Sequence, residues 1–143
     1  MTEMNEMEEM CVIKRSGKKE TIAFDKILNR LRKLGTEAGL TINYTNLAIK
    51  VIDQLHEDIA TSQIDELAAQ QCASMITVHP DYGILAGRIV VSNHQKNTFS
   101  SFKDAMHQLY TFRDIHGKAS ALISSSLWEV TDTNAEAIEA KIN

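Results

Sequence analysis

Residues 11–28 read CVIKRSGKKETIAFDKIL, and within this stretch the spacing of the apolar side chains changes once. β-prone residues flank the turn dipeptide Ser16-Gly17, which predicts a β-hairpin over residues 11–23. From Phe24 onward the apolar residues follow helical spacing, with Gly35 placed to end the helix. The stretch therefore predicts a hairpin that leads directly into an amphipathic helix.

Further apolar stripes with helical spacing fill most of the remaining chain. These stripes run from Leu47 to Ile59, Ile64 to Ile76, Tyr82 to Val90 and Phe99 to Tyr110. The fourth stripe follows the third with little interruption. The second stripe is entered through Thr61-Ser62, with Asp65 at a spacing like that of a capping box. Two shorter helices are expected at 119–129 and 134–142. The predicted fold class is α+β and mostly helical, a β-hairpin packed on a bundle of amphipathic helices.

The bulk composition limits the compartment and the class of protein. A chain of 143 residues that is 43% hydrophobic can bury a core of its own. No apolar run is long enough to cross a bilayer, and no signal peptide is recognisable. Cys11 and Cys72 match no metal or redox spacing. We therefore expect a cytoplasmic protein with no membrane contact.

Charge is distributed unevenly along the chain. Residues 1–10 contain four glutamates and no basic residue, which predicts a disordered acidic tail. Residues 11–34 contain eight lysines and arginines against only Glu20 and Asp25. Such a local excess can meet a phosphate group, a nucleic acid or only solvent.

Motifs for catalysis are missing from the sequence. It contains no GxxxxGK[ST] phosphate loop, no GxGxxG after a strand and no GxSxG elbow. The five histidines show no HExxH-like pairing. The neighbouring carboxylates Asp65 and Glu66 would point to different faces of a helix. We therefore predict no catalytic residue and no metal site in this chain.

The basic hairpin and the helix after it form a better candidate for a binding site. Lys14 and Arg15 follow the first strand, and Lys26 lies in the first helical turn. A triphosphate needs several cations that converge from rigid elements, because an isolated exposed pair contributes little. Backbone groups at 20–23 can meet an adenine edge, and the Glu20 carboxylate can accept from its amino group. A solvated basic surface is the alternative, and the residues alone leave both open.

Three ordered blocks resemble the ATP-cone of class I ribonucleotide reductase large subunits of the eukaryotic and viral type. The family's opening V-I-K-R-D-G followed by F-D-K-I is similar to VIKRSGKKE at 12–20 and FDKI at 24–27. Its T-x-x-L-D-x-L-A-A helix start resembles Thr61 and DELAA at 65–69. The most specific block is HPDYGILAGRI at 79–89, continuing through VSN at 91–93 to Lys96. These blocks cover residues 11–96, and weaker similarity continues to about residue 130.

The resemblance implies a domain that binds ATP as an activator and dATP as an inhibitor, together with Mg²⁺ and without a redox cofactor. It places Thr61 and Asp65 near the ribose. The residues implied at the phosphates are Lys14, Arg15, Lys26 and Lys96. Those implied at the adenine are Glu20, Thr21, Ile22, Ala23, Phe24 and Asp25.

The resemblance also implies an organisation and partners. Residues 1–10 would be the acidic tail, 11–100 the ATP-cone regulatory domain, and 101–143 a helical connection toward a catalytic barrel that this sequence lacks. The chain would then be part of a longer reductase. That enzyme would associate with itself as a dimer, and as a higher oligomer with dATP. It would also bind a radical-bearing small subunit, and no nucleic acid.

A few positions depart from the family pattern. Ser16 replaces the usual aspartate of the turn, which suits a turn equally well. His94-Gln95 replaces Leu-His before Lys96. Gly83 and Gly87 replace alanines, and these two replacements lower helix stability slightly.

Two other functions fit parts of the pattern. An ATP-cone transcriptional regulator would bind DNA, but it should carry a zinc ribbon with CxxC pairs, which this sequence lacks. A helical interaction domain with a degenerate cone would show a flat titration with ATP.

Overall fold

A computed structural model describes residues 10–142, which divide between Asn93 and His94 into two compact units. These are called the first unit and the second unit below. Of the predicted acidic tail, only Met10 is among the described residues. The described residues form seven helices and a small three-stranded sheet, so the mostly helical α+β fold class is confirmed.

The predicted hairpin is confirmed, and its turn is built as the sequence indicates. β1 (Cys11–Ile13) pairs antiparallel with β2 (Lys19–Thr21). The Lys14 N–H donates to the Lys18 carbonyl at 2.9 Å, and Gly17 has a φ of 78°, a conformation that glycine adopts without a steric penalty. The turn therefore carries Lys14 and Arg15 on a fixed backbone.

A third strand, β3 (Ile59–Ala60), pairs in parallel with β1, and the strand order is β2-β1-β3. The predicted helical stripe from Leu47 to Ile59 is therefore wrong in its second half. The helix there ends at Ile52, and the chain then turns to place Ile59 opposite Val12. Pairing with a distant strand, instead of local periodicity, decides the conformation of this segment.

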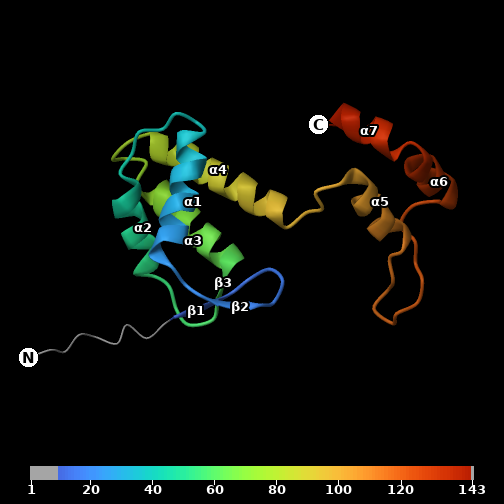
Figure 1. The fold of residues 1–143 in the computed structure, drawn as a ribbon, viewed down its shortest axis with the longest axis horizontal. Helices are drawn as coiled ribbons and strands as arrows, with labels where there is room; N and C mark the ends of the chain where they lie inside the picture. Colours follow the sequence, from blue (N-terminus) through green and yellow to red (C-terminus); the bar gives the residue numbers. More distant parts are fainter. Residues whose placement is uncertain (1–9, 143) are drawn as a thin grey trace, which may run out of the picture. The chain divides into compact units, whose positions relative to one another are not determined.

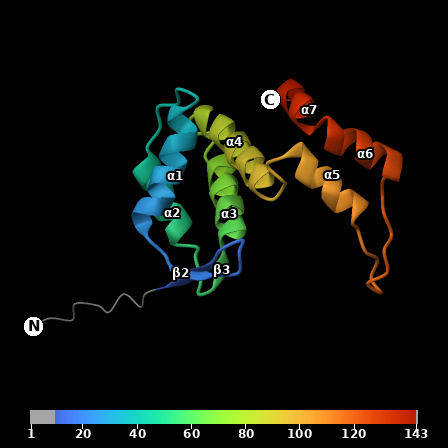
Figure 2. The same ribbon diagram turned by 45° about the vertical axis from the view of Figure 1, so that its right-hand side comes forward.

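Four helices make up the rest of the first unit: α1 (Phe24–Thr36), α2 (Tyr44–Ile52), α3 (Thr61–Ser74) and α4 (Asp81–Lys96), whose last three residues fall in the second unit. Both ribbon views show the sheet at one end of this bundle (Figure 1 and Figure 2). β2 leads directly into α1, and β3 leads directly into α3. The sheet therefore fixes where the first turns of α1 and α3 lie.

The core of the first unit draws on the sheet and on all four helices. Val12 and Ile59 are buried in it, which anchors β1 and β3 to the bundle. The Cys72 side chain is fully buried, and burial raises the pKa of its thiol to about 12. This cysteine therefore stays protonated and packs as a small apolar residue, as the sequence predicts.

Gly35 does not end α1 as predicted; it lies inside the last turn, and the helix ends at Thr36. A Cβ atom on this residue would lie 2.6 Å from Cζ of Tyr44, at the start of α2. The Tyr44 hydroxyl donates to the Leu40 carbonyl at 2.6 Å, and this bond holds the Tyr44 ring against Gly35 of α1. Glycine is needed here for close approach between two helices.

Gly35→Ala should lower the free energy of unfolding by about 1–3 kcal/mol, because the added methyl group overpacks the contact with Tyr44. Gly87→Ala is the matched control, since this glycine is exposed on α4 and a Cβ there would meet nothing within 4 Å. The control should raise stability by about 0.5–1 kcal/mol through helix propensity. Urea denaturation measures both, and equal effects at the two glycines would contradict the assigned role of Gly35.

The second unit contains α5 (Phe102–Tyr110), α6 (Ser125–Thr133) and α7 (Ala135–Ile142). α5 begins after a break, with Ser101 as its N-cap, so the stripe from Phe99 is separated from the preceding helix. The helix predicted from residue 119 begins only at Ser125, where the Ser124 side chain accepts from the Leu127 N–H. No helix among residues 10–142 combines the length and apolar character needed to cross a bilayer.

Candidate functional site

Glu20 brings together two of the predicted phosphate-binding lysines. Its carboxylate, on β2, forms ion pairs with Lys14, which follows β1, and with Lys26, in the first turn of α1. The side chains of Lys14 and Lys26 remain 48% and 66% exposed, so both stay accessible from solvent. One carboxylate shared by two cations leaves this group with a net positive charge. The hairpin and α1 thus present lysines at one place.

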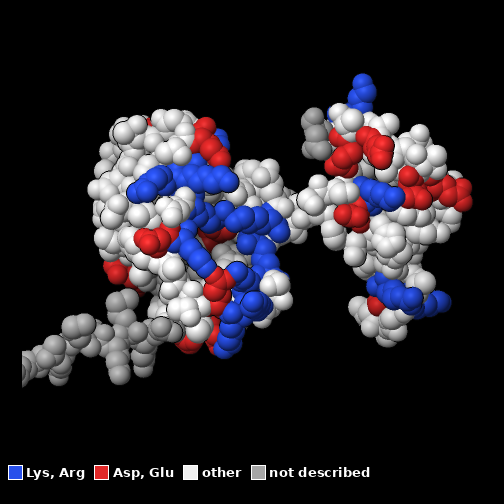
Figure 3. Space-filling view, viewed as in Figure 1, with Lys and Arg blue, Asp and Glu red and all other residues white. Residues whose placement is uncertain are grey.

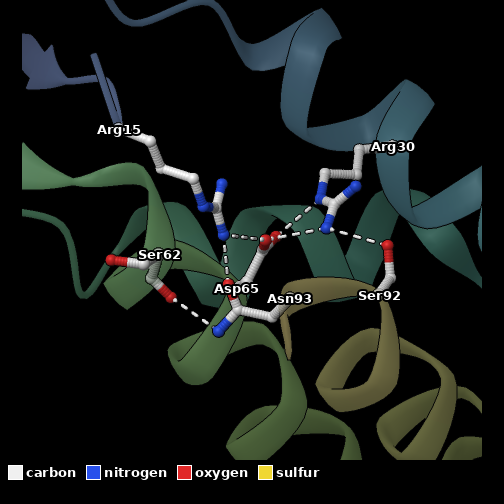
Figure 4. A network of polar contacts seen from close by, with 6 residues as sticks. All are labelled: Arg15, Arg30, Ser62, Asp65, Ser92 and Asn93. Carbon is white, nitrogen blue, oxygen red and sulfur yellow. Dashed lines mark hydrogen bonds and ion pairs between the residues drawn. The ribbon is translucent and has the colours of Figure 1, made fainter. Parts of the chain in front are cut away.

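Asp65 forms the centre of a second group of charges (Figure 4). Its side chain, on α3, is only 7% exposed. Arg30 of α1 binds it with two parallel bonds, Nε to Oδ1 at 2.6 Å and Nη2 to Oδ2 at 2.7 Å. Arg15 approaches the same carboxylate from the hairpin turn, with Nη2 3.6 Å from Oδ2. Two guanidinium groups again share one carboxylate.

α4 completes the network around Arg15 and Arg30. The Arg15 Nη2 group donates to the side-chain oxygen of Asn93, whose amide nitrogen donates to the Ser62 carbonyl at 3.3 Å. Arg30 Nη2 lies 3.4 Å from the Ser92 hydroxyl oxygen. Asn93 is 8% exposed, and these two bonds give both ends of its buried amide a hydrogen-bond partner. The turn, α1, α3 and α4 therefore meet around a single buried carboxylate.

The two groups adjoin along the chain. Lys14 and Arg15 are neighbours in the turn, and Lys26 and Arg30 are four residues apart on α1, which places them on one helix face. Together the four cations exceed Glu20 and Asp65 by two positive charges. Lysine and arginine gather on one face of the first unit, with acidic side chains among them (Figure 3). An arrangement of this kind can bind a polyphosphate through charge-assisted hydrogen bonds.

The backbone of β2 limits how the predicted adenine segment can act. The Ile22 N–H donates to the Met10 carbonyl at 2.9 Å, so this group is already used in the sheet. In an antiparallel ladder the neighbouring residue points its backbone groups the other way. Thr21 therefore directs its N–H and carbonyl away from β1. Since β2 is an edge strand of this sheet, these groups lie at its outer edge. Of the predicted strand residues, Thr21 has the backbone best placed for an adenine edge.

The remaining predicted residues lie at helix ends. Phe24 and Asp25 are exposed in the first turn of α1, and Ala23 precedes that turn as its N-cap. Lys96 is the last residue of α4 and is exposed. Thr61 is the first residue of α3, close in sequence to the Asp65 group.

The predicted capping box at the start of α3 is wrong. The N-cap is Ala60, and its N–H donates to Gln63 Oε1 at 3.3 Å. Asp65 lies two residues beyond Gln63, which occupies the capping position, and Arg30 holds its carboxylate instead.

Arg30 and Asn93 are the site residues that sequence reasoning missed. Arg30 has a detectable signal, because its spacing from Lys26 puts both cations on one face of α1. No comparable signal exists for Asn93, which meets Arg15 across 78 residues of sequence. Only the packing of α4 against the turn reveals that contact.

Lys19 is engaged outside these two groups. Its ammonium lies 2.6 Å from Asp58 Oδ2, and this hydrogen bond is the main cause of a raised pKa of Lys19. The neighbouring Glu57 carboxylate accepts from the Cys11 N–H at 3.1 Å. These contacts tie the segment before β3 to the hairpin.

Comparisons with known proteins converge on one description. Residues 10–97 match the family described as the ATP cone domain. The chain is 41% identical over 135 residues to the ribonucleoside-diphosphate reductase large subunit of Caenorhabditis elegans, covering 92% of this chain and 17% of that protein. It is 40% identical over 134 residues to the ribonucleoside-diphosphate reductase large chain of Cryptosporidium parvum, covering 94% of this chain and 17% of that protein. It is 39% identical over 137 residues to the ribonucleoside-diphosphate reductase large subunit of Vaccinia virus (strain Copenhagen), covering 93% of this chain and 18% of that protein. The chain spans less than a fifth of the length of these relatives.

Proposed function

Because this chain belongs to the ATP-cone family, we propose that it is the regulatory domain of a ribonucleoside-diphosphate reductase large subunit and binds ATP and dATP as allosteric effectors. One observation carries the proposal. The family match over residues 10–97 includes every residue of the Glu20 and Asp65 groups, where four cations exceed two carboxylates. Effectors that carry a triphosphate and Mg²⁺ supply the negative charge that this excess favours.

We propose the following roles for the individual residues. Lys14, Arg15 and Lys26 would contact the phosphates, and Lys96 would join them from the end of α4. Glu20 and the outer edge of Thr21 would meet the adenine, with residues 22–25 beside it. Thr61 and Asp65, in the first turns of α3, would lie near the ribose. Arg30 would hold the Asp65 carboxylate in place.

Calorimetric titration with ATP, dATP and GTP in the presence of Mg²⁺ tests the proposal. ATP and dATP should bind saturably, and at a concentration of a hundred Kd each should stabilise the chain by about 2.7 kcal/mol. GTP should bind more weakly, because its base reverses the donor and acceptor pattern of adenine at Glu20 and Thr21. If saturating ATP and dATP release no heat and leave Tm unchanged, the chain is not a nucleotide-binding domain.

Substitution of single lysines separates a formed site from a diffuse basic surface. Lys14→Ala and Lys96→Ala should each weaken ATP binding by about 1–3 kcal/mol, the range for charge-assisted hydrogen bonds. Lys33→Ala should have little effect, because this lysine is exposed in the last turn of α1, far along the helix from Lys26. Calorimetry on the three variants gives the comparison. Equal losses at all three positions would indicate a diffuse surface.

The wider proposal concerns the parent protein. We propose that it reduces ribonucleoside diphosphates in the cytoplasm together with a radical-bearing small subunit. Its large subunit would associate as a dimer and, with dATP, as a higher oligomer. Residues 11–100 would form the regulatory domain, and residues 101–143 would connect it to the catalytic part. Its similarity to ribonucleoside-diphosphate reductase large subunits supports the part of this proposal that concerns a reductase.

A further inference from the structure

Arg15 approaches the Asp65 carboxylate less closely than Arg30 does. Arg30 binds Asp65 with two bonds of 2.6 and 2.7 Å, which is the bidentate geometry of a strong arginine–carboxylate pair. The closest Arg15 nitrogen is 3.6 Å from Oδ2, beyond the length of a charge-assisted hydrogen bond. Arg30 alone therefore satisfies Asp65, and Arg15 can leave without exposing a buried, unpaired carboxylate.

A hydrogen bond to Asn93 is one of the contacts that hold the Arg15 side chain. The acceptor is a neutral amide oxygen, and Asn93 is itself held by its bond to the Ser62 carbonyl. Asn93 is 8% exposed, on a face of α4 that packs into the first unit, so it offers its oxygen in a fixed direction. A phosphate oxygen carries a negative charge that the amide oxygen lacks, so it attracts the guanidinium more strongly. A phosphate can therefore displace this amide as a partner of Arg15.

We propose that Asn93 is a positioning residue of the phosphate site: it holds Arg15 in the nucleotide-free domain, and a bound triphosphate takes Arg15 from it. The inference rests on the proposed function, because it assigns a competitor to one of the phosphate-binding cations. Asn93 touches no nucleotide in this scheme and acts only through Arg15. Its bond to Arg15 opposes binding of the phosphates and leaves binding of the nucleoside unaffected.

The test compares ATP with adenosine, which carries the same base and ribose but no phosphate. Asn93→Ala should bind ATP about two- to tenfold more tightly, the range that corresponds to the net contribution of a typical hydrogen bond. Its affinity for adenosine should equal that of the wild type. In the Arg15→Ala background the same substitution should leave ATP affinity unchanged, because the residue that Asn93 acts through is gone. Asn93→Asp should weaken ATP binding, since a carboxylate holds Arg15 more strongly than an amide.

Calorimetry on the full chain gives all of these affinities, with circular dichroism as the check of folding. Asn93→Asp carries the test alone if the alanine variant does not fold. The inference is overturned if Asn93→Ala binds ATP equally or more weakly, or if the gain persists without Arg15. It is also overturned if Asn93→Asp binds ATP as the wild type does. If the wild type binds no ATP, the proposed function is overturned as well. If the wild type binds ATP and the Asn93 variants bind it with the same affinity, only this inference is overturned.

Discussion

Asp65→Ala is expected to lower the free energy of unfolding by about 3–5 kcal/mol, the cost of breaking a buried ion pair by removing one partner. The Asp65 side chain is 7% exposed and holds Arg30 by two short bonds while Arg15 lies nearby. Alanine would leave two guanidinium groups crowded together without their shared counter-charge. Urea denaturation followed by far-ultraviolet circular dichroism measures the loss.

Glu66→Ala is the matched control for this prediction. Glu66 is the next residue on α3 and is exposed, so its removal should change stability by less than about 0.5 kcal/mol. A small effect at Asp65, similar to that at Glu66, would show that the buried network contributes little to the fold.

Asp65→Asn should have its largest effect on regulation in the proposed parent large subunit. ATP and dATP differ only at the 2′ position, so a switch has to convert one hydroxyl group into a different protein conformation. One hydrogen bond supplies about 1–3 kcal/mol, which shifts a two-state population roughly ten- to a hundredfold. The amide keeps the shape of the side chain but loses the charge that binds Arg30 and attracts Arg15. The variant should therefore bind both nucleotides while the difference between their effects becomes smaller.

Sedimentation of the parent protein with each nucleotide measures this effect. The wild type should form higher oligomers with dATP, and Asp65→Asn should form fewer of them. Glu66→Gln makes the same chemical change on an exposed neighbour and should respond as the wild type does. An unchanged dATP response in Asp65→Asn would leave this residue with a purely structural role.

Local patterns in the sequence predict much of this fold. The hairpin forms where β-prone residues flank Ser16-Gly17, and α1 begins at Phe24, where the period changes. β3 escaped prediction because a two-residue strand has no period of its own and exists only through its pairing with β1. Gly35 was misassigned for a related reason, since a neighbouring helix, not a helix end, requires a glycine there.

In the candidate site, too, local sequence patterns predict the contacts between residues near in sequence but not those between distant residues. Lys14, Glu20 and Lys26 lie within thirteen residues of one another, and the hairpin and first turn of α1 bring them together as the local pattern predicts. The contacts of Arg30 with Asp65 and of Arg15 with Asn93 span 35 and 78 residues. Such pairs depend on how α3 and α4 pack against α1, which no local spacing records.

The central claim is that the cations around Glu20 and Asp65 form one nucleotide site. The most direct measurement is an NMR titration of the isotope-labelled chain with ATP and Mg²⁺, in which the backbone amide shift of each residue is followed. The largest shift changes should cluster at residues 14–26 with Asp65 and Asn93, and they should saturate together at one nucleotide per chain. The claim is contradicted if these amides do not move. Small changes spread over the basic residues of both units, including Arg113 and Lys118, would contradict it equally.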